Sequence, residues 1–439
     1  MIDTLQTERA VLVGLERQKN KGLWGSEDSL QELAQLAHTA GIYVAGQAVQ
    51  RLPHPQPTTY IGAGKVEELR AQIAASRAGT VLFDDELSPD QQRTLERLFG
   101  EEVKVLDRTA LILDIFARHA HTREGILQVE LAQYEYRLPR LTRSWTHLIR
   151  QAGGHAAGAI GGVGLRGPGE TQLETDRRQI HARIASLKQE LEAVRAHRRQ
   201  QYRQRRRTGI RSLCLVGYTN AGKSSLLNAL TEAQEGEHGR RGGVLVANQL
   251  FSTLDPTTRR IRLPGGAQAL ITDTVGFINK LPHHLVAAFR ATLEGIQEAD
   301  LLLHVVDVTH PRAEAHLEAG RTVLRELEVM DKPQLVVWNK IDLAPDPSRR
   351  HWQAEDGFQA TSAVSREGLP ELLAKVERLL LEDLVALEVE IPYGADGLKH
   401  QIFTQGTVEW VRYEENGTRI KAHLPPALAA QLQSYRRFS

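Results

Sequence analysis

A glycine-rich run between an apolar stretch and a helical stretch constrains the fold of this chain more than any other feature. The apolar residues 212–217 predict a buried strand, and residues 225–230 predict a helix. Between them, Gly217-Tyr-Thr-Asn-Ala-Gly222-Lys223-Ser224 matches the pattern GxxxxGK[ST]. Strand, glycine loop and helix in this order predict a phosphate-binding loop, because glycine lets backbone N–H groups approach phosphate oxygens and the helix N-terminus attracts anions. The motif alone leaves ATP and GTP open.

Within this loop, we expect Lys223 to reach the β- and γ-phosphates and Ser224 to ligate Mg²⁺. Asn220 is similar to an asparagine with which some GTPases recruit K⁺ against the phosphates, although it could simply brace the loop. The predicted nucleotide-binding residues here are Gly217, Tyr218, Thr219, Asn220, Ala221, Gly222, Lys223, Ser224 and Ser225.

A second motif identifies the base. Residues 335–338 predict another strand, which ends in Asn339-Lys340-Ile341-Asp342. The two carboxylate oxygens of Asp342 can accept the N1–H and the 2-amino group of guanine, and adenine lacks this donor pair. We expect Asn339 to brace the loop and the Lys340 stem to lie over the base. Thr361-Ser362-Ala363, before a predicted helix, fits the loop that contacts guanine O6. The base-binding residues predicted are Asn339, Lys340, Ile341, Asp342, Ser362, Ala363 and Val364.

Two segments between these motifs fit nucleotide-sensing switches. In the second, Asp273 would hold Mg²⁺ through water and the Gly276 N–H would meet the γ-phosphate. In the first, Thr253 would ligate Mg²⁺, with Thr257 and Thr258 as rivals that spacing cannot exclude. The switch residues predicted to contact nucleotide are Phe251, Ser252, Thr253, Leu254, Asp255, Asp273, Thr274, Val275 and Gly276. The residues to which we assign a catalytic role are Lys223, Thr253 and Gly276.

The order of the motifs carries more weight than any one of them. Each motif alone could be an ordinary strand-to-helix turn, but four follow one another in order, each at the end of an apolar strand. The segment resembles the translation-factor-like GTPases, which implies a Ras-like doubly wound sheet. Many GTPases place a water-orienting glutamine after the second-switch glycine. This chain has Phe277 there, so we expect slow intrinsic hydrolysis, with Phe277 packed under the switch as the simpler interpretation of that residue.

Composition sets the general class of protein. A length of 439 residues predicts about three domains, and 41% hydrophobic with 25% charged residues is ordinary for a globular protein. The single cysteine, Cys214, excludes a disulfide framework and suits a reducing cytosol. We expect no secretory signal, because the N-terminus lacks a basic n-region and a long apolar core. We expect no membrane span, because no apolar run approaches the required ~18–20 residues, and we expect a cytoplasmic location.

A helical hairpin is predicted between the N-terminal region and the phosphate loop. Apolar residues recur at alternating spacings of four and three over 127–148 and again over 180–194, as in the seam of a coiled coil. Thr171 and Glu174 form a capping box for the second helix, and Pro139 should kink or break the first. We favour an antiparallel hairpin, although an intermolecular coiled coil would use the same pattern.

The interruption of this hairpin is rich in glycine and its flanks are basic. Residues 151–170 contain eight glycines, and residues 134–211 carry 17 Lys and Arg against 6 Asp and Glu, whereas the whole chain has a net charge of only +1. Such asymmetry favours contact with a polyanion. A flexible linker and a solvated charged face are the simpler alternatives. The RNA-contacting residues predicted are Arg166, Arg177, Arg178, Arg198, Arg199, Arg205 and Arg206.

The complete pattern predicts a multidomain α/β protein. The expected parts are a small N-terminal α/β domain (1–122), the antiparallel helical hairpin (123–208, tip loop 151–170), the Ras-like GTPase domain (209–383) and a small α+β C-terminal domain (384–439). The N-terminal strands are expected at 10–15, 42–49, 80–83 and 103–106, with helices near 27–40, 65–77 and 88–99.

Several runs resemble the HflX-type GTPases, notably residues 161–178, residues 60–69, the segment Phe251–Asp255 and the apolar residue after Gly276. The resemblance covers nearly the whole chain and is weakest over the last ~55 residues. It implies a protein that binds the large ribosomal subunit and its rRNA, splits stalled or idle ribosomes, and hydrolyses GTP to GDP when the ribosome stimulates it. It also favours Thr253 as the switch threonine, and some members bind a second nucleotide through the N-terminal region.

Two other functions compete with ribosome splitting. A GTPase of ribosome assembly would bind immature particles in preference to finished subunits. A nucleotide-gated scaffold would use the hairpin to bind protein helices, and its binding would depend weakly on salt. We expect a monomer that uses Mg²⁺, with K⁺ as a second ion to test.

Overall fold

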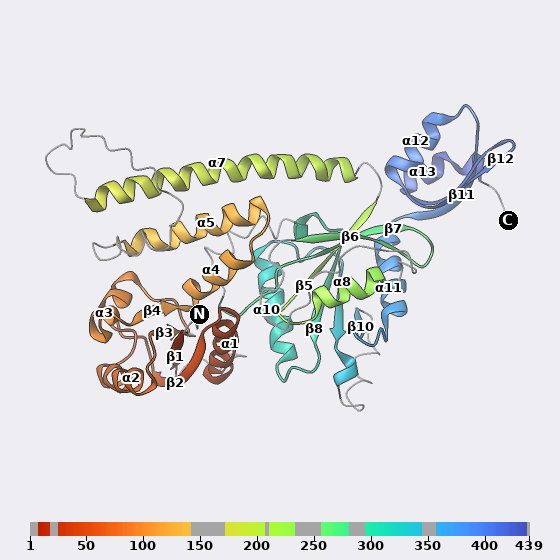
Figure 1. The fold of residues 1–439 in the computed structure, drawn as a ribbon. Coiled ribbons are helices and arrows are strands. Elements are labelled where there is room, and N and C mark those ends of the chain that lie inside the picture. The colour runs from red at the N-terminus through yellow and green to blue at the C-terminus, as the bar shows by residue number, and fades with distance from the viewer. Residues whose placement is uncertain are drawn as a thin grey trace, which may run out of the picture. The chain divides into compact units, whose positions relative to one another are not determined.

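The computed structural model describes residues 8–17, 25–141, 172–206, 210–232, 256–280, 295–344 and 357–436. The chain folds into two compact units, and the boundary between them falls within one long helix, between Val194 and Arg195. Each unit is described by itself. Among the described residues, three sheets follow one another along the chain (Figure 1).

The first unit begins with a parallel sheet of order β2-β1-β3-β4. Its elements are β1 (Arg9–Arg17), α1 (Ser26–Thr39), β2 (Tyr43–Leu52), α2 (Ala63–Ser76), β3 (Thr80–Phe83), α3 (Pro89–Phe99), β4 (Lys104–Asp107) and α4 (Arg108–His119). All four predicted strands and all three predicted helices are confirmed, with ends shifted by up to three residues. Helix α4 was not predicted.

Helices cover both faces of this sheet. The inward residues Val11 and Val13 of β1 share a core with Leu69 of α2 and Leu95 of α3. Side chains alternate across a strand, so Gly14 faces the other side, where a Cβ atom would lie 2.9 Å from a methyl group of Leu30 in α1. The alternation therefore places α2 and α3 on one face and α1 on the opposite face.

The predicted helical hairpin forms within the chain. Its helices are α5 (Arg123–Arg137), followed by the 3₁₀ turn η1 (Leu138–Arg140), and α7 (Gln172–Arg206), which lie side by side in Figure 1. The buried seam contains Leu127, Leu131, Leu141, Ile180, Ile184, Leu187 and Leu191. Arg183 adds two hydrogen bonds to Glu130 across the pair, at 3.0 and 2.9 Å. Helix α5 ends just before Pro139, as that residue predicts, whereas Thr171 and the tip loop lie outside the described residues.

The second unit contains a six-stranded sheet of order β10-β9-β8-β5-β7-β6, in which only the β6–β7 pairing is antiparallel. Its elements are β5 (Arg211–Gly217), α8 (Lys223–Glu232), β6 (Thr257–Arg262), β7 (Gln268–Asp273), β8 (Leu301–Asp307), α10 (Ala313–Glu326), β9 (Gln334–Asn339), η2 (Ile341–Leu343), β10 (Phe358–Ala360) and α11 (Leu369–Leu381). This is the doubly wound sheet predicted from the motifs.

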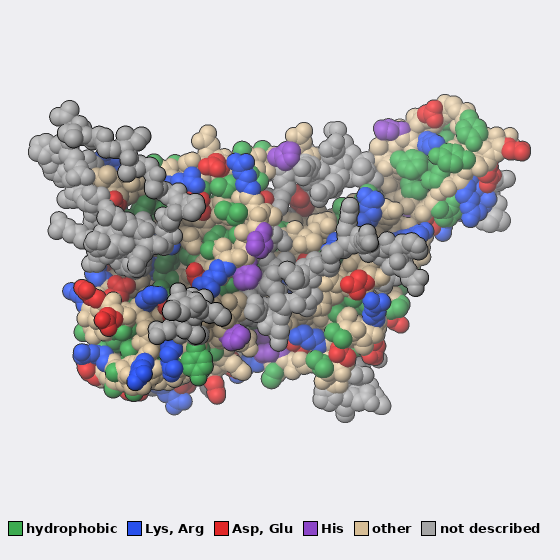
Figure 2. Space-filling model, in the orientation of Figure 1, with side chains coloured by type: hydrophobic (Ala, Val, Ile, Leu, Met, Phe, Trp, Pro, Cys, Tyr) green, Lys and Arg blue, Asp and Glu red, His purple; other side chains and the backbone are tan. Residues whose placement is uncertain are grey.

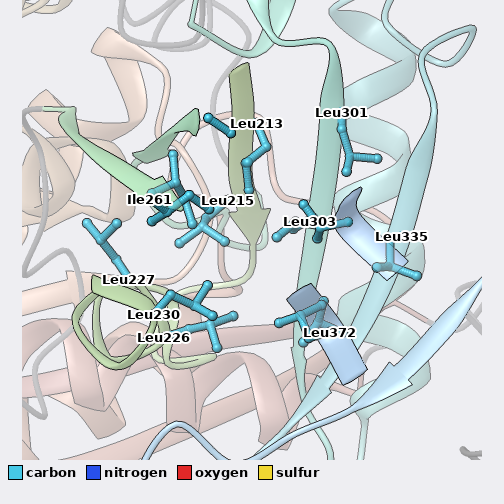
Figure 3. Close-up of a cluster of buried hydrophobic side chains, with 14 of the residues drawn as sticks. Leu213, Leu215, Leu226, Leu227, Leu230, Ile261, Leu301, Leu303, Leu335 and Leu372 are labelled. Carbon is cyan, nitrogen blue, oxygen red and sulfur yellow. The ribbon is translucent and has the colours of Figure 1, made fainter. Parts of the chain in front are cut away.

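The core of this sheet has two faces. Figure 3 shows leucines of β5, β8 and β9 pointing toward Leu226 and Leu230 of α8 and Leu372 of α11. On the opposite face, Val306 of β8 and Trp338 of β9 are buried with Leu317 of α10. Because both faces are covered, the central strands are almost continuously apolar, and their polar residues appear where the strands end.

The second unit ends in an antiparallel sheet of order β11-β13-β12. Its elements are β11 (Val385–Pro392), α12 (Asp396–Gln405), β12 (Thr407–Glu414), β13 (Gly417–Leu424), α13 (Pro426–Gln431) and η4 (Gln433–Tyr435), an α+β module as predicted. Figure 2 shows hydrophobic side chains gathered over this module, where Tyr393, Phe403 and Tyr413 are exposed.

Candidate guanine-nucleotide site

The phosphate loop connects the end of β5 to the start of α8, at the carboxyl edge of the parallel strands. Gly217 has a φ of +144°, and a Cβ atom there would lie 2.2 Å from the carbonyl oxygen of Val305. Gly222 has a φ of +89°, and its Cβ would lie 2.3 Å from the Asn339 amide nitrogen. Both positions therefore require glycine, which lets the loop fold tightly against β8 and the base-recognition segment.

Lys223 is buried at the first position of α8. Its Nζ donates to the carbonyl oxygens of Gly217 at 3.1 Å and Tyr218 at 2.8 Å, so the ammonium group is held over the loop. Burial lowers the pKa of Lys223 to about 8, and the negative charge of Asp273 partly offsets this. A phosphate placed on the loop would supply the negative charge that favours the ammonium form.

The predicted magnesium ligand is close to the predicted second switch. The Ser224 hydroxyl donates to a carboxylate oxygen of Asp273 at 2.6 Å, and Asp273 itself is fully buried at the end of β7. A hydroxyl and a carboxylate in contact are hard oxygen donors that fit Mg²⁺, which commonly takes one or two protein ligands and completes its shell with phosphate and water. Thr253, the third residue of this prediction, lies outside the described residues.

Asn339 connects the two loops that would enclose a base. Its amide nitrogen donates to the carbonyl oxygen of Ala221 at 2.9 Å, and its amide oxygen accepts the Ala363 N–H at 3.1 Å. The next residue, Lys340, forms an ion pair with Asp307 at 2.7 Å. Oδ1 of Asp342 is buried and finds no hydrogen-bond partner among the described residues. An acceptor in this position fits the N–H donors of guanine.

The last predicted contact comes from the loop between β10 and α11. Ser362 is fully buried, and its hydroxyl accepts the N–H groups of Val364 at 3.2 Å and Ser365 at 2.9 Å. This turn holds the backbone beside Asn339, whereas the Val364 side chain is 81% exposed. The Ser362–Val364 loop and the Asn339–Asp342 segment, which the sequence separates by about twenty residues, therefore meet at the base-binding end of the site.

The second switch packs directly on the phosphate loop. The Phe277 N–H donates to the Gly217 carbonyl at 2.9 Å, and the Thr219 N–H donates to the Phe277 carbonyl at 2.8 Å. A Cβ atom on Gly276 would lie 2.7 Å from the Cα atom of Thr219, so glycine is needed for this approach. The Phe277 side chain is only 3% exposed and contacts the Gly320 position of α10. Its ring is therefore part of the core, in agreement with the simpler interpretation of this residue.

Other predicted residues are placed less completely. The rival switch threonines, Thr257 and Thr258, lie in β6, where the Thr258 hydroxyl is 2.9 Å from that of Thr272. Arg177 and Arg178 are exposed on α7. Outside the described residues lie Phe251, Ser252, Leu254, Asp255, Arg166 and the side chains of Arg198, Arg199, Arg205 and Arg206.

Sequence reasoning missed a group of aromatic and histidine side chains under the phosphate loop. The Tyr218 ring stacks on His316 of α10 with centroids 3.9 Å apart, and His316 stacks on His310 at 4.1 Å. Burial lowers the pKa of His316 to about 4. His304 of β8 is 1% exposed, and burial lowers its pKa to about 3. The three histidines lie in β8, in the loop that follows it and in α10, and they match no sequence motif.

Comparison with known proteins agrees with this geometry. Residues 27–117 match a family described as GTP-binding GTPase N-terminal, residues 119–206 match GTP-binding GTPase Middle Region, and residues 212–340 match 50S ribosome-binding GTPase. The chain is 43% identical over 425 residues to GTPase HflX of Lacrimispora saccharolytica, covering 97% of this chain and 95% of that protein. This chain belongs to the HflX family of GTPases. It hydrolyses GTP, and residues 212–340 belong to its GTPase domain.

A second HflX protein is similar to this chain over a comparable length. GTPase HflX of Escherichia coli is 41% identical over 414 residues, covering 94% of this chain and 92% of that protein. A solved structure described as SsGBP in complex with GDP covers 85% of this chain and 99% of its own, with 25% identity and a TM-score of 0.45. Among the described residues, no helix is long and apolar enough to cross a membrane.

Proposed function

We propose that this GTPase binds the large ribosomal subunit and splits stalled or idle ribosomes, with GTP hydrolysis that the ribosome stimulates. The observation that carries the proposal is the match of residues 212–340 to a family described as 50S ribosome-binding GTPase, within a chain that resembles GTPase HflX over nearly its whole length. GTP acts as a timer, because work comes from the difference in ribosome affinity between the GTP and GDP forms.

The nucleotide chemistry is assigned to the residues predicted from the motifs. Lys223 neutralises the β- and γ-phosphates, Ser224 holds Mg²⁺ together with Thr253, and Gly276 donates its N–H to the γ-phosphate. Asp342 accepts from the guanine base. When bound, Mg²⁺ supplies positive charge to the phosphates. Phe277 stands where many GTPases have a glutamine after Gly276, and its buried apolar ring cannot orient a water molecule.

The hairpin is assigned to contact with ribosomal RNA. The seam between α5 and α7 is buried, so the Ile180–Leu191 part of α7 is stiffened by its partner helix. Arg177 and Arg178 are exposed near the end of α7 that follows the glycine-rich tip. Contact between several arginines and phosphates predicts binding that falls steeply with ionic strength. Binding through an apolar coiled coil would be far less sensitive to salt.

The first experiment measures GTP turnover with and without purified large subunits, in K⁺ and in Na⁺ buffers. Strong stimulation by mature subunits is expected, and a faster rate in K⁺ would extend the proposal to Asn220. Stimulation by immature particles alone would favour ribosome assembly instead. Turnover that remains slow under every condition would favour a nucleotide-gated scaffold.

The second experiment deletes residues 153–169 and follows ribosome splitting by light scattering. We expect GTP affinity to be unchanged and splitting to be lost, and continued splitting would show that the tip is not the working part. A charge reversal, Arg177→Glu with Arg178→Glu, should weaken subunit binding and reduce its dependence on salt. Arg70→Glu on α2 is the matched control, because Arg70 is also an exposed helical arginine and lies outside the hairpin.

A further inference from the structure

The side chain of Tyr218 is directed away from the surface of the phosphate loop. It is 4% exposed, and its ring lies nearly parallel to that of His316, with an interplanar angle of 6°. His310 stacks on the other end of the group, and its Nδ1 accepts the Arg312 N–H at 3.1 Å. The stack fixes the position of the Tyr218 ring relative to α10.

The phenol of Tyr218 also contacts the second switch. Its oxygen accepts the backbone N–H of Asn279 at 2.6 Å. Two residues earlier, Phe277 exchanges backbone hydrogen bonds with Gly217 and Thr219 and buries its ring beside His304 and Gly320. The chain that follows Gly276 is therefore held at two consecutive points, once through Phe277 and once through Asn279.

We propose that Tyr218 is a positioning residue for GTP hydrolysis, which fixes the second switch against the phosphate loop through the Asn279 N–H. The inference rests on the proposed role of Gly276 as a donor to the γ-phosphate. Phe277 stands in place of a glutamine, so the side chain directly after Gly276 cannot orient a water molecule. Hydrolysis therefore depends more strongly on correct placement of the Gly276 N–H against the γ-phosphate. We assign this placement to the side chains of Tyr218 and His316, and leave the predicted nucleotide contact of Tyr218 to its backbone.

A positioning role differs from a role in building the loop. The ring of Tyr218 contributes packing and its oxygen contacts the second switch, so we expect removal of that single atom to leave phosphate binding intact. GDP lacks the γ-phosphate and does not engage Gly276, so GDP affinity reports on the loop alone. The affinity for a non-hydrolysable GTP analogue, divided by that for GDP, reports on the switch.

The test compares Tyr218→Phe with the unchanged protein, with no ribosomal subunits present. We expect turnover at saturating GTP to fall about fivefold, as loss of one hydrogen bond allows, together with a lower ratio of analogue to GDP affinity and a GDP affinity within about twofold. Tyr413→Phe, at an exposed tyrosine of β12, is the matched control and should change neither quantity.

Substitutions at His316 separate stacking from bulk stability. His316→Phe keeps a flat ring beside Tyr218 and should retain turnover. His316→Ala should lower turnover as much as Tyr218→Phe does, and the double variant should be little slower than either single variant. Unchanged turnover and unchanged affinity ratio in Tyr218→Phe would overturn the inference. A parallel loss of GDP affinity would also overturn it, because it would show that the tyrosine builds the loop. Failure of ribosome stimulation would refute the proposed function and leave this measurement unaffected.

Discussion

The side-chain amide of Asn339 joins the base-recognition segment to the phosphate loop through a 2.9 Å hydrogen bond to the carbonyl oxygen of Ala221. The bond bridges β9 and the β5–α8 loop, and the amide oxygen holds the Ala363 N–H at the same time. The pocket is therefore braced by Asn339, and Asp342 takes no part in this bracing. Substitution of Asp342 should change base preference while the loops keep their places.

Asp342→Asn tests base recognition. An asparagine side chain offers one acceptor and one donor in place of two acceptors, so it leaves one guanine N–H without a partner and can pair with the C2 oxygen of xanthine. GTP affinity should fall by at least about 100-fold and XTP affinity should rise, as measured by equilibrium binding. Asp331→Asn, at an exposed position in the turn before β9, is the control. Unchanged GTP affinity would contradict the assignment.

Lys223 should make nucleotide affinity depend on pH. Its pKa is lowered to about 8 by burial, and bound phosphate favours the charged form, so binding takes up a proton once the free lysine is neutral. GDP affinity should be level below about pH 7 and should weaken as the pH rises above 8, with proton uptake visible by calorimetry in two buffers. Lys223→Arg keeps its charge and should give a flat profile between pH 7 and 8.8. A flat profile in the unchanged protein would refute the assignment.

His304 should make the GTPase domain sensitive to acid. Neither ring nitrogen has a hydrogen-bond partner among the described residues, and burial lowers the pKa of His304 from 6.5 to about 3. As the pH falls, His304 of the unfolded chain takes up a proton before His304 of the folded protein does. The free energy of unfolding therefore falls between pH 6.5 and pH 3, and at pH 5 the loss is about 2 kcal/mol. His304→Leu removes this loss.

The measurement for His304→Leu is hydrogen exchange of the β8 amides at pH 7.5 and pH 5. The variant should be as stable as the unchanged protein at pH 7.5, because no hydrogen bond is lost, and more stable at pH 5. His400→Gln, at an exposed histidine of α12, should leave the difference between the two pH values unchanged. An equal acid loss in His304→Leu would exclude His304 as its source.

Arg140 anchors the hairpin to the N-terminal sheet. Its guanidinium donates to the Leu87 carbonyl at 2.7 Å, lies 3.5 Å from the carboxylate of Asp107 and lies 3.7 Å from the centre of the Tyr136 ring. Arg140→Ala leaves a fully buried carboxylate without its counter-charge. Burial already raises the pKa of Asp107, so the free energy of unfolding should fall by about 3–5 kcal/mol.

Urea unfolding of Arg140→Ala, monitored by hydrogen exchange of the α5 amides, measures the loss in the free energy of unfolding. The control is Arg51→Ala, because Arg51 and Glu16 form a short but exposed ion pair whose removal should leave the unfolding midpoint unchanged. Equal effects of the two substitutions would show that burial of the Asp107 charge is not what makes Arg140 important.

Local sequence patterns were enough to predict much of this protein. The phosphate loop, the Asn339–Asp342 motif and the seam of the hairpin each depend on residues a few positions apart, whose spacing reports strand, turn or helix directly. Helix α4 escaped prediction because it starts at Arg108, immediately after β4. Asp107 ends the strand and caps the helix through the Ala110 N–H at 2.8 Å, so no turn residues separate the two.

By itself, the sequence determined which local elements form and which motifs we expect to contact guanine nucleotide. Only the tertiary structure decided that Tyr218 stacks on His316, that the Phe277 ring enters the core, and that Arg140 meets Asp107. These residues lie far apart along the chain and share no period, so their contacts arise only when crossover connections bring separate strands and helices together. Burial then fixes their charges and hydrogen bonds, because a buried polar group must find its partner within the fold.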